Sequence, residues 1–547
     1  MSMFCFQCQE TAGNSGCTVK GVCGKDQETA NLQDVLVYAL KGLAGLARRR
    51  AGSGEGIAAE AELIMRGLFA TITNANFDPE RIRSLVFEAL QRKAELAASV
   101  PRKELTGVDA WQAASVEELE AAFSRASVLA EEDPDARSLK EFIVYGMKGL
   151  SAYGDHAGIL GFRDEELDRE LVDILAAVND PLSTEELTGL LVRTGEACVR
   201  AMALLDRANT STYGNPEVTR VDIGVRNRPG ILVSGHDLKD LEELLEQTRG
   251  AGVDVYTHGE MLPAHYYPAF KKYKHLAGNY GGSWWRQGSE FESFNGPILM
   301  TTNCIIPVKG TYRGRIFTTG MAGYPGVAHI PDRRDGKPKD FSRIIELARS
   351  CPPPRGIENG EIVGGFAHHQ VEQLAGKVVD AVKSGAIKKF VVMGGCDGRM
   401  KSRQYFTDLA GALPPDTVIL TAGCAKYRYN KLPLGEIGGI PRVLDAGQCN
   451  DSYSIAAVAL KLAEILDVDD INQLPVDFAV AWYEQKAVCV LLALLALGFK
   501  GVRIGPTLPA FVSENVKQLI VQTYGLKATA DVASDLQAIL GNLLVYG

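Results

Sequence analysis

Residues 230–260 read GILVSGHDLKDLEELLEQTRGAGVDVYTHGE, and this stretch decides the fold of the larger part of the chain. It contains a short aliphatic run at 230–234, a helical segment at 238–249 and a second aliphatic run at 253–257. A strand, a crossover helix and a second strand in this order predict two parallel strands in one sheet. The same alternation continues toward the C-terminus, so the chain beyond about residue 220 is predicted to be α/β.

Six aliphatic runs in this region are each followed by a potential metal ligand. The runs lie at 230–234, 253–257, 297–301, 389–393, 417–420 and 442–444, and the residues that follow them are His236, Glu260, Cys304, Cys396, Cys424 and Cys449. Ligands bind at the carboxyl ends of the strands in open parallel sheets, so these side chains are expected to converge. Taken singly, each has a structural alternative as a helix cap, an ion-pair partner or a buried thiol.

The residue types indicate the kind of metal site. Thiolates, an imidazole and a carboxylate together exceed what one tetrahedral zinc binds, and their mixture of soft and hard donors suits a polynuclear iron cluster. Glu484 and Lys486, in the segment WYEQK, add a carboxylate and a proton donor. On residue type alone, this pair is predicted to lie on the surface of a helix.

The N-terminus predicts a second metal site. Four cysteines form a C-x2-C-x8-C-x5-C array: Cys5, Cys8, Cys17 and Cys23. The chain has no secretory signal shape, so a reducing cytoplasmic location is expected, which argues against two disulfides. Zinc remains an alternative, but the second tight cysteine pair that zinc sites usually have is absent, since Cys17 and Cys23 are separated by five residues. The surrounding glycines let backbone amides approach cluster sulfides. A 4Fe-4S cubane is therefore favoured.

Residues before 220 follow helical periodicity almost throughout. Helix starts are indicated at Asp78, at Ser115 and at Ser183. The segment VYALKGLAGL at 37–46 is followed 107 residues later by VYGMKGLSAY at 144–153. Each copy precedes two further helical stretches, at 57–73 and 78–98 and then at 164–178 and 183–207. We predict two tandem three-helix bundles, with chance similarity of two amphipathic helices as the alternative.

These patterns give three predicted domains, at 1–220, 221–370 and 371–547. A length of 547 residues fits this number, and a net charge of −9 argues against nucleic acid or an anionic membrane as a partner. The apolar run at 488–499 is too short to cross a bilayer and is predicted to be a buried helix. No G-x-G-x-x-G turn lies between a strand and a helix, so no nucleotide site is predicted. Cys198, Cys351 and Cys489 are predicted to be structural.

The ligand-bearing segments resemble those of the hybrid cluster proteins, also called prismane proteins or hydroxylamine reductases. The resemblance covers essentially the whole chain, and its motifs are SGHDL, THGEMLPAHYYP, TTNCIIP, GGCDGR, TAGCAKYRYN, DAGQCNDSYS and WYEQKA, in the family's order. The N-terminal cysteine spacing is that of the cubane-containing branch. The resemblance implies a multidomain fold in which a helical domain of two three-helix bundles is followed by two Rossmann-like α/β domains with mainly parallel sheets, distantly similar to nickel carbon monoxide dehydrogenases.

The resemblance also implies roles for individual residues. Cys5, Cys8, Cys17 and Cys23 would hold one 4Fe-4S cluster. A hybrid 4Fe-2O-2S type cluster would be held by His236, Glu260, Cys304, Cys396, Cys424, Cys449 and Glu484, with Cys396 as a persulfide. Lys486 would stand beside the open iron positions. Glu484, Lys486, Glu260 and His236 are the candidate catalytic residues, through labile carboxylate ligands and proton delivery.

The implied activity is reduction of hydroxylamine to ammonia and water, with the cubane as electron relay. Reduction of nitric oxide and non-enzymatic nitric oxide sensing with protein S-nitrosylation remain alternatives. Carbon monoxide dehydrogenase activity is disfavoured by the ligand set of the second site. Electrons would come from a separate reductase or small redox protein.

Overall fold

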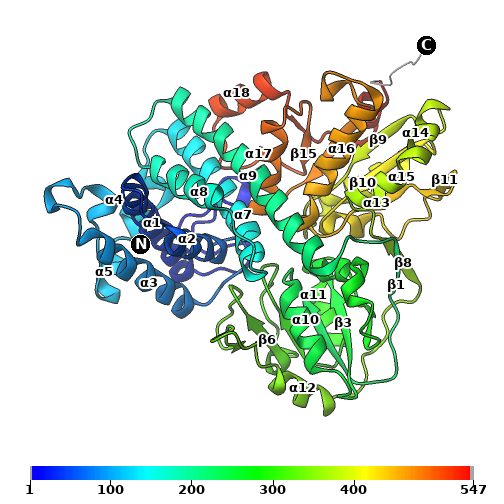
Figure 1. The fold of residues 1–547 in the computed structure, drawn as a ribbon, viewed down its shortest axis with the longest axis horizontal. Helices are drawn as coiled ribbons and strands as arrows, with labels where there is room; N and C mark the ends of the chain where they lie inside the picture. Colours follow the sequence, from blue (N-terminus) through cyan, green and yellow to red (C-terminus); the bar gives the residue numbers. More distant parts are fainter. Residues whose placement is uncertain (1–2, 542–547) are drawn as a thin grey trace.

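The structure is a computed structural model and describes residues 3–541. A helical region, blue to cyan in Figure 1, lies on one side, and two α/β regions, green and yellow to red, lie on the other. The helices of the first region are α1 (Gln27–Gly52), α2 (Ala58–Ala70), α3 (Pro79–Ala97), α4 (Gly107–Ala110), α5 (Val116–Ala121), α6 (Phe123–Ala126), α7 (Pro134–Ile159), α8 (Glu165–Ala177) and α9 (Thr184–Tyr213). The predicted order of a helical region before α/β regions is confirmed.

The predicted helix starts coincide with side-chain caps. The Asp78 carboxylate accepts a hydrogen bond from the backbone N–H of Glu80 at the start of α3. Ser183 and Glu186 form a reciprocal capping box at the start of α9, in which each side chain accepts from the other residue's backbone N–H. Such caps satisfy N–H groups that have no partner inside the helix, so they fix where a helix begins.

The two helix triplets, α1–α3 and α7–α9, interlock, because the middle helix of each one packs against the first helix of the other. Besides its contacts within its own triplet, α2 packs along α7 of the second triplet, and α8 packs along α1 of the first. The buried side chains of both triplets therefore belong to one continuous hydrophobic core. The repeat read from the sequence thus produces two triplets that interlock rather than two bundles that stand apart.

Two six-stranded sheets with all-parallel pairing form the α/β regions. The first sheet has the order β4-β3-β2-β5-β6-β7 and the second the order β13-β10-β9-β14-β15-β16. Their bounds are β2 (Gly230–Ser234), β3 (Asp254–His258), β4 (Leu276–Asn279), β5 (Ile298–Met300), β6 (Ile316–Thr319) and β7 (Ala328–Ile330), then β9 (Lys389–Val392), β10 (Thr417–Thr421), β13 (Val443–Asp445), β14 (Val476–Ala481), β15 (Arg503–Gly505) and β16 (Lys527–Ala528). All six predicted runs are strands.

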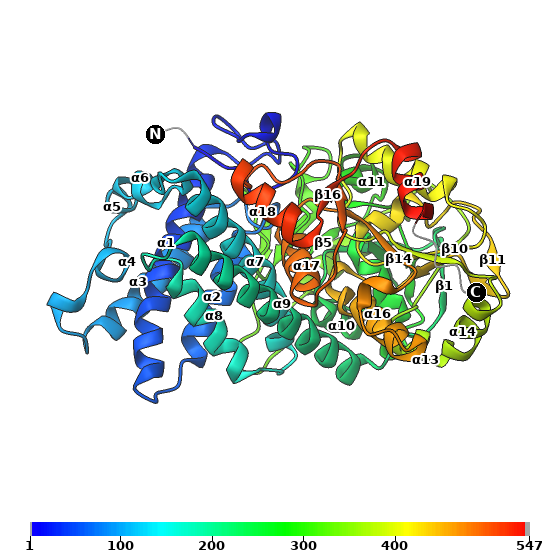
Figure 2. The ribbon, with the colours of Figure 1, turned by 90° about the horizontal axis from the view of Figure 1, so that it is seen from above.

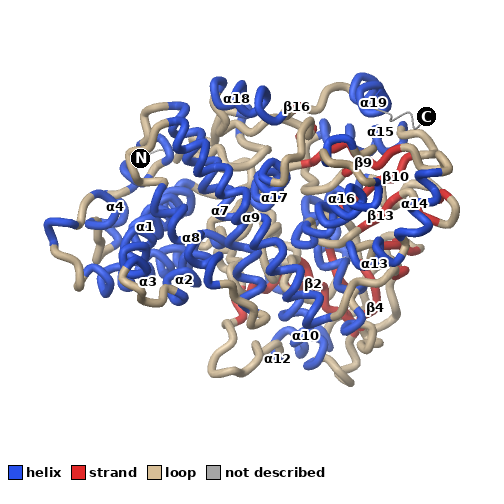
Figure 3. Tube along the Cα trace, turned by 45° about the horizontal axis from the view of Figure 1, so that its top comes forward, coloured by secondary structure: helices blue, strands red, loops and turns tan. Residues whose placement is uncertain are grey.

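Helices accompany both sheets, and Figure 3 shows the strands enclosed by helices and loops. They are α10 (Leu238–Gln247), α11 (Gln287–Ser293), α12 (Ser342–Arg349), α13 (His368–Gln373), α14 (Ala375–Lys383), α15 (Gln404–Ala412), α16 (Tyr453–Leu466), α17 (Gln485–Ala496), α18 (Glu514–Tyr524) and α19 (Val532–Gly541). The apolar helix α17 packs against α7 and α9 and joins the second sheet to the helical region. The predicted buried helix is therefore confirmed, and within residues 3–541 no helix is long and apolar enough to cross a membrane.

Two short antiparallel ribbons complete the fold. β1 (Thr219–Asp222) pairs with β8 (Glu361–Gly364), and β11 (Glu436–Ile437) pairs with β12 (Ile440–Pro441). The first ribbon lies where the two α/β regions meet (Figure 1). The predicted domain limit at 220 falls within β1 and that at 370 falls within α13. We propose that the β1–β8 ribbon marks the junction between the three domains.

Candidate metal centres

All seven residues predicted for the hybrid cluster follow carboxyl ends of strands in the two large sheets. The loops after β2, β3 and β5 carry His236, Glu260 and Cys304, and the loops after β9, β10, β13 and β14 carry Cys396, Cys424, Cys449 and Glu484. The order in which successive strands are added reverses between the parallel neighbours β2 and β5 in the first sheet and between β9 and β14 in the second. Each such switch point opens a crevice at the carboxyl edge, and loops from both crevices meet in this site.

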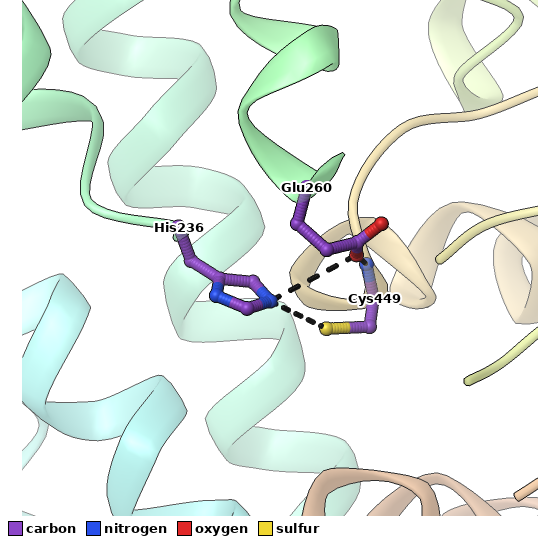
Figure 4. A group of neighbouring side chains, drawn as sticks. All are labelled: His236, Glu260 and Cys449. Carbon is purple, nitrogen blue, oxygen red and sulfur yellow. Dashed lines mark hydrogen bonds and ion pairs between the residues drawn. The ribbon is translucent and has the colours of Figure 1, made fainter. Parts of the chain in front are cut away.

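The tightest group in the site is formed by His236, Glu260 and Cys449, whose ligand atoms lie within 4.8 Å of one another. Figure 4 shows the imidazole Nε2 of His236 directed toward the other two side chains. Nε2 lies 3.2 Å from Cys449 Sγ and 3.9 Å from Glu260 Oε2. Three donors from two different sheets therefore converge although 213 residues separate His236 from Cys449.

The contacts around this group leave His236 Nε2 and Glu260 Oε1 available to a metal. His236 Nδ1 lies 2.8 Å from Thr302 Oγ1, which also accepts from the His236 backbone N–H. A proton on Nδ1 shared with Thr302 leaves Nε2 unprotonated, as metal ligation requires. Glu260 Oε2 accepts from the backbone N–H of Cys449, while Glu260 Oε1 is buried without a hydrogen-bond partner. A buried carboxylate oxygen without a partner fits a metal ligand.

Electrostatics link the other thiols to this group. Burial raises the pKa of Cys304, Cys424 and Cys449, and each is raised further by the nearby Glu260 carboxylate. Burial also raises the pKa of Cys396 to about 12, with the Glu484 carboxylate adding to the shift. Burying this many thiols and carboxylates together disfavours their anionic forms unless a cation neutralises them. A bound metal cluster would supply that positive charge.

Glu484 and Lys486 are not a surface pair, and that prediction from residue type is wrong. Glu484 is 3% exposed and Lys486 is fully buried. Glu484 follows β14 and caps α17, where its Oε2 accepts from the backbone N–H of Lys486 at 2.8 Å. Strand β14, which was not predicted, is what brings the carboxylate to the site. The assignment of both residues from the family resemblance remains a prediction.

Lys486 is the cationic group that faces the buried anions. Its Nζ donates to Asn303 Oδ1 at 3.2 Å, and Asn303 directly precedes Cys304. Burial lowers the pKa of Lys486, but the Cys449 thiolate and the Glu484 carboxylate outweigh burial and raise it overall. The ammonium group of Lys486 is therefore retained at neutral pH.

Glycines with positive φ shape the ligand loops at close range. Gly423 (φ +89°) precedes Cys424, and a Cβ there would overlap the carbonyl oxygen of Gly395. Gly395 (φ +103°) precedes Cys396, and a Cβ there would overlap the carbonyl oxygen of Ala481 in β14. Only glycine permits two loops to pass this closely. The cysteine positions thus depend on the glycines before them.

Cys304 adopts a strained backbone. Its φ is +80°, an uncommon value for a residue with a side chain. The carbonyl of Cys304 accepts from Gln287 Nε2 at 2.6 Å, and the next backbone N–H, of Ile305, donates to the carbonyl of Asn74. Such strain costs about 1–3 kcal/mol and clusters at functional sites, where surrounding contacts maintain it.

The four N-terminal cysteines form the second candidate centre. Cys5 and Cys17 pair as an antiparallel bridge through N–H···O bonds of 3.0 and 2.8 Å. Burial raises the pKa of Cys8, and the charges of Cys23, Cys5 and Cys17 raise it further. The four thiols therefore lie within electrostatic reach of one another. This grouping fits the predicted cubane ligands.

The loop around these cysteines donates to sulfur and approaches it closely. The backbone N–H of Ala12 donates to Cys17 Sγ at 3.4 Å, and a Cβ on Gly21 would lie 3.0 Å from Cys23 Sγ. Lys25 is buried nearby. Burial lowers its pKa, but the Cys5 and Cys23 thiolates raise it overall. A buried cation and close amides suit a cluster that carries negative charge.

The three cysteines predicted to be structural are not in the ligand group of His236, Glu260 and Cys449. Cys198 in α9 and Cys489 in α17 are fully buried, and the Cys198 thiol is 3.9 Å from the carbonyl oxygen of Gly146. Cys351 is half-buried, and its thiol donates to the carbonyl of Leu347.

Two cavities border the predicted hybrid cluster site. One, of about 130 Å³, is lined by apolar side chains such as Val392 and Phe478 and reaches Cys396, Cys449 and Lys486. The other is polar and reaches Thr302. Three residues near the site were not predicted from the sequence: Thr302, Asn303 and Tyr153. The hydroxyl of Tyr153 donates to the carbonyl of Cys449. The polar triplet Thr301-Thr302-Asn303 at the end of a predicted strand was the available signal for the first two.

The fold and site define a multidomain metalloprotein in which two parallel sheets and a helical region enclose buried thiolate-rich centres. The chain matches the Prismane/CO dehydrogenase family over residues 3–537 and belongs to that family. It is 58% identical to the hydroxylamine reductase of Nitratidesulfovibrio vulgaris, covering 98% of this chain and all of the relative, and 60% identical to the hydroxylamine reductase of Desulfosudis oleivorans at the same coverage.

Solved structures show the same fold at low sequence identity. Carbon monoxide dehydrogenase IV from Carboxydothermus hydrogenoformans has a TM-score of 0.56 and 16% identity, covering 98% of this chain and 92% of that one. The likeness concerns the fold alone, and it agrees with the predicted multidomain α/β architecture. The family membership supports iron–sulfur clusters as the cofactors of this chain.

Proposed function

We propose that the protein is an iron–sulfur oxidoreductase that reduces hydroxylamine to ammonia and water. The observation that carries the proposal is the convergence of His236, Glu260 and Cys449 from the ends of both parallel sheets, with the buried ammonium of Lys486 in electrostatic contact with Cys449, Glu484 and Cys304. Relatives at 57–60% identity over nearly their whole length are named hydroxylamine reductase. High identity over the full length supports transfer of the activity.

Two clusters are proposed as cofactors. Cys5, Cys8, Cys17 and Cys23 would hold one 4Fe-4S cubane as electron relay. A hybrid 4Fe-2O-2S type cluster would be held by His236, Glu260, Cys304, Cys396 as a persulfide, Cys424, Cys449 and Glu484. When bound, such a cluster supplies electrons and open coordination positions for the nitrogen or oxygen of the substrate.

The reaction requires two electrons and two protons for each hydroxylamine. The N–O bond breaks, nitrogen leaves as ammonia, and the hydroxyl leaves as water. Both electrons must come from a separate reductase or small redox protein, because hydroxylamine is the species that is reduced. A cytoplasmic location, where reduced donors are available, belongs to the same proposal.

Lys486 is the proposed proton donor to the leaving hydroxyl. Its ammonium lies among the Cys449, Glu484 and Cys304 side chains and is oriented by Asn303. Glu260 and Glu484 are the proposed labile ligands, because carboxylates exchange more readily than thiolates at iron. The Thr302 hydroxyl holds His236 with Nε2 facing Glu260 and Cys449, which keeps the imidazole in the ligating tautomer.

The first experiment measures metal content and activity of anaerobically purified protein. About eight irons per chain, with less acid-labile sulfide than iron, is the expected content of one cubane and one oxygen-containing cluster. Ammonia should then form from hydroxylamine with reduced methyl viologen as donor, at two electrons per ammonia. Zinc in place of iron, or iron-loaded protein without ammonia formation, would contradict the proposal.

Reduction of nitric oxide is a second candidate. The apolar cavity beside Cys396 and Cys449 favours an uncharged diatomic molecule over a polar one. Stopped-flow measurement of nitric oxide consumption by the reduced protein, in parallel with the hydroxylamine assay, compares the two substrates. Sustained consumption of reductant would separate catalysis from stoichiometric nitrosylation of thiols.

A further inference from the structure

The polar cavity lies between the helical region and the first large sheet. Its volume is about 380 Å³, and its wall includes Arg66, Asp155 and His156 from the helical region and Thr302, Arg333 and Lys339 from the other side. Thr302 connects the cavity to the metal site, because its hydroxyl contacts both the backbone nitrogen and the Nδ1 of His236. The cavity thus approaches the proposed hybrid cluster from a different wall than the apolar cavity.

Most charged groups in this wall are already paired. Arg333 contacts Asp240 at 2.7 Å and Glu243 at 2.7 Å, and Lys339 contacts Asp240 at 2.9 Å. Arg66 pairs with Glu88 at 3.1 Å. Because these side chains satisfy one another, they provide a polar lining without a strong net demand for an ionic ligand.

His156 is the exception in the wall. It is 6% exposed, and its Nε2 is buried without a hydrogen-bond partner. The ring packs edge-on against Phe69, with centroids 5.5 Å apart, which holds it in place. A buried imidazole nitrogen without a partner is costly unless a ligand or water satisfies it.

The protonation states of His156 and Asp155 also favour a neutral ligand. Burial lowers the pKa of His156 to about 4, so the imidazole is neutral at pH 7 and Nε2 can either donate or accept. Burial raises the pKa of Asp155 to about 7, so a large fraction of this carboxyl is protonated at neutral pH. Hydroxylamine, a small neutral molecule with a hydroxyl and an amino group, matches these donors and acceptors.

We propose that this cavity is the binding site through which hydroxylamine reaches the metal centre, with His156 Nε2 as its principal hydrogen-bond partner and Asp155 beside it. The inference rests on the proposed function and adds a specificity-determining site to it. His156 acts here by binding substrate before reaction, and the chemical step remains at the centre around Lys486. Polar substrate and apolar gas would then use separate cavities.

The test compares His156→Phe, which keeps an aromatic ring against Phe69 but removes Nε2, with His369→Phe, a change at a half-buried histidine in α13 away from the cavity. Isothermal titration of hydroxylamine into the oxidised holoenzyme, without electron donor, measures binding in the absence of turnover. Steady-state assays with reduced methyl viologen measure KM and kcat, and nitric oxide consumption is measured in parallel.

We expect His156→Phe to weaken hydroxylamine binding about five- to tenfold and to raise KM by the same factor, the effect of one lost hydrogen bond. The kcat at saturating hydroxylamine, the nitric oxide rate and all properties of His369→Phe should stay unchanged. Unchanged affinity and KM would overturn the inference, as would a loss of kcat at constant KM or an equal loss with nitric oxide.

Asp155→Asn is the second variant and decides the question where His156→Phe does not fold. It keeps the side-chain shape and should raise KM in the same direction, whereas an unchanged KM would overturn the inference. If the wild-type holoenzyme does not reduce hydroxylamine at all, the proposed function fails. The calorimetric comparison of wild type with His156→Phe still reports on the cavity in that case.

Discussion

Replacing Gly423 with Ala should remove the hybrid cluster while leaving the cubane in place. Gly423 has φ +89° and ψ 177°, a conformation that is essentially restricted to glycine. Its backbone N–H donates to the carbonyl of Gly447 at 3.1 Å, and a Cβ on it would overlap the carbonyl oxygen of Gly395. One residue therefore fixes the spacing of the loops that carry Cys396, Cys424 and Cys449.

The free-energy cost of Gly423→Ala has two parts. The unfavourable backbone conformation costs about 1–3 kcal/mol for a residue with a Cβ. The overlap with Gly395 adds a displacement of the neighbouring loop, because the obstructing atom is backbone and cannot rotate away. Gly435→Ala is the matched control, since Gly435 has a similar φ of +82° but open space around a Cβ. It introduces backbone strain without crowding.

Iron analysis and electron paramagnetic resonance of the purified variants test this reasoning. Gly423→Ala should hold about four irons per chain, with the cubane signal retained, and Gly435→Ala should hold about eight. A Gly423→Ala protein with full iron content and wild-type turnover would refute the argument. Equal iron loss in both variants would attribute the effect to backbone strain rather than to crowding between loops.

Four further predictions follow from the same contacts. Glu484→Ala should leave the cubane spectrum intact but lower hydroxylamine turnover by at least about 100-fold, because a labile ligand is lost; retained turnover speaks against this role. Lys486→Met should lower kcat by about 100- to 10,000-fold, because the proposed proton donor is lost. Since the pKa of Lys486 is raised, the kcat of the wild-type enzyme should not fall between pH 7 and 9 through deprotonation of this group. Comparing the pH–rate profiles of wild type and variant checks both expectations. Cys8→Ser should remove the cubane signal and slow reduction of the second cluster by an external donor in stopped-flow experiments, and unchanged reduction would place electron entry elsewhere. Burial raises the pKa of Asp168 in α8 to about 6, above its value in the unfolded chain. Ionisation of this carboxyl therefore destabilises the fold as the pH rises toward and above 6. Asp168→Asn should raise the urea midpoint of unfolding at about pH 8, and should raise it less at about pH 5.

Several features of the fold were predictable because their signals are local. The runs at 230–234 and 417–420 are strands because aliphatic residues between glycines and polar loops favour buried parallel strands. The helix starts at Asp78 and Ser183 were predictable because a cap acts within one turn. Strand β16, with two residues, is too short to show a pattern of its own.

The burial of Glu484 and Lys486 could not be predicted from local pattern. A Glu and a Lys two residues apart are usually solvated, and only the packing of α17 against α7 and α9 places them inside. The same holds for His156 in α7 and Thr302 after β5, which line the same cavity although 146 residues separate them. No local sequence pattern around either residue indicates that the two lie close together.

The sequence by itself determined six of the strands and the main helices before residue 220, and it placed a potential ligand after each of those six strands. This was possible because hydrophobic periodicity and turn chemistry act over a few residues, and because ligands of an open parallel sheet stand at strand ends. Only the tertiary structure decided that His236, Glu260 and Cys449 meet within 4.8 Å and that a lysine faces them. Those distances depend on the order of strands in two sheets and on their packing against the interlocked helices, which are contacts between residues far apart in the chain.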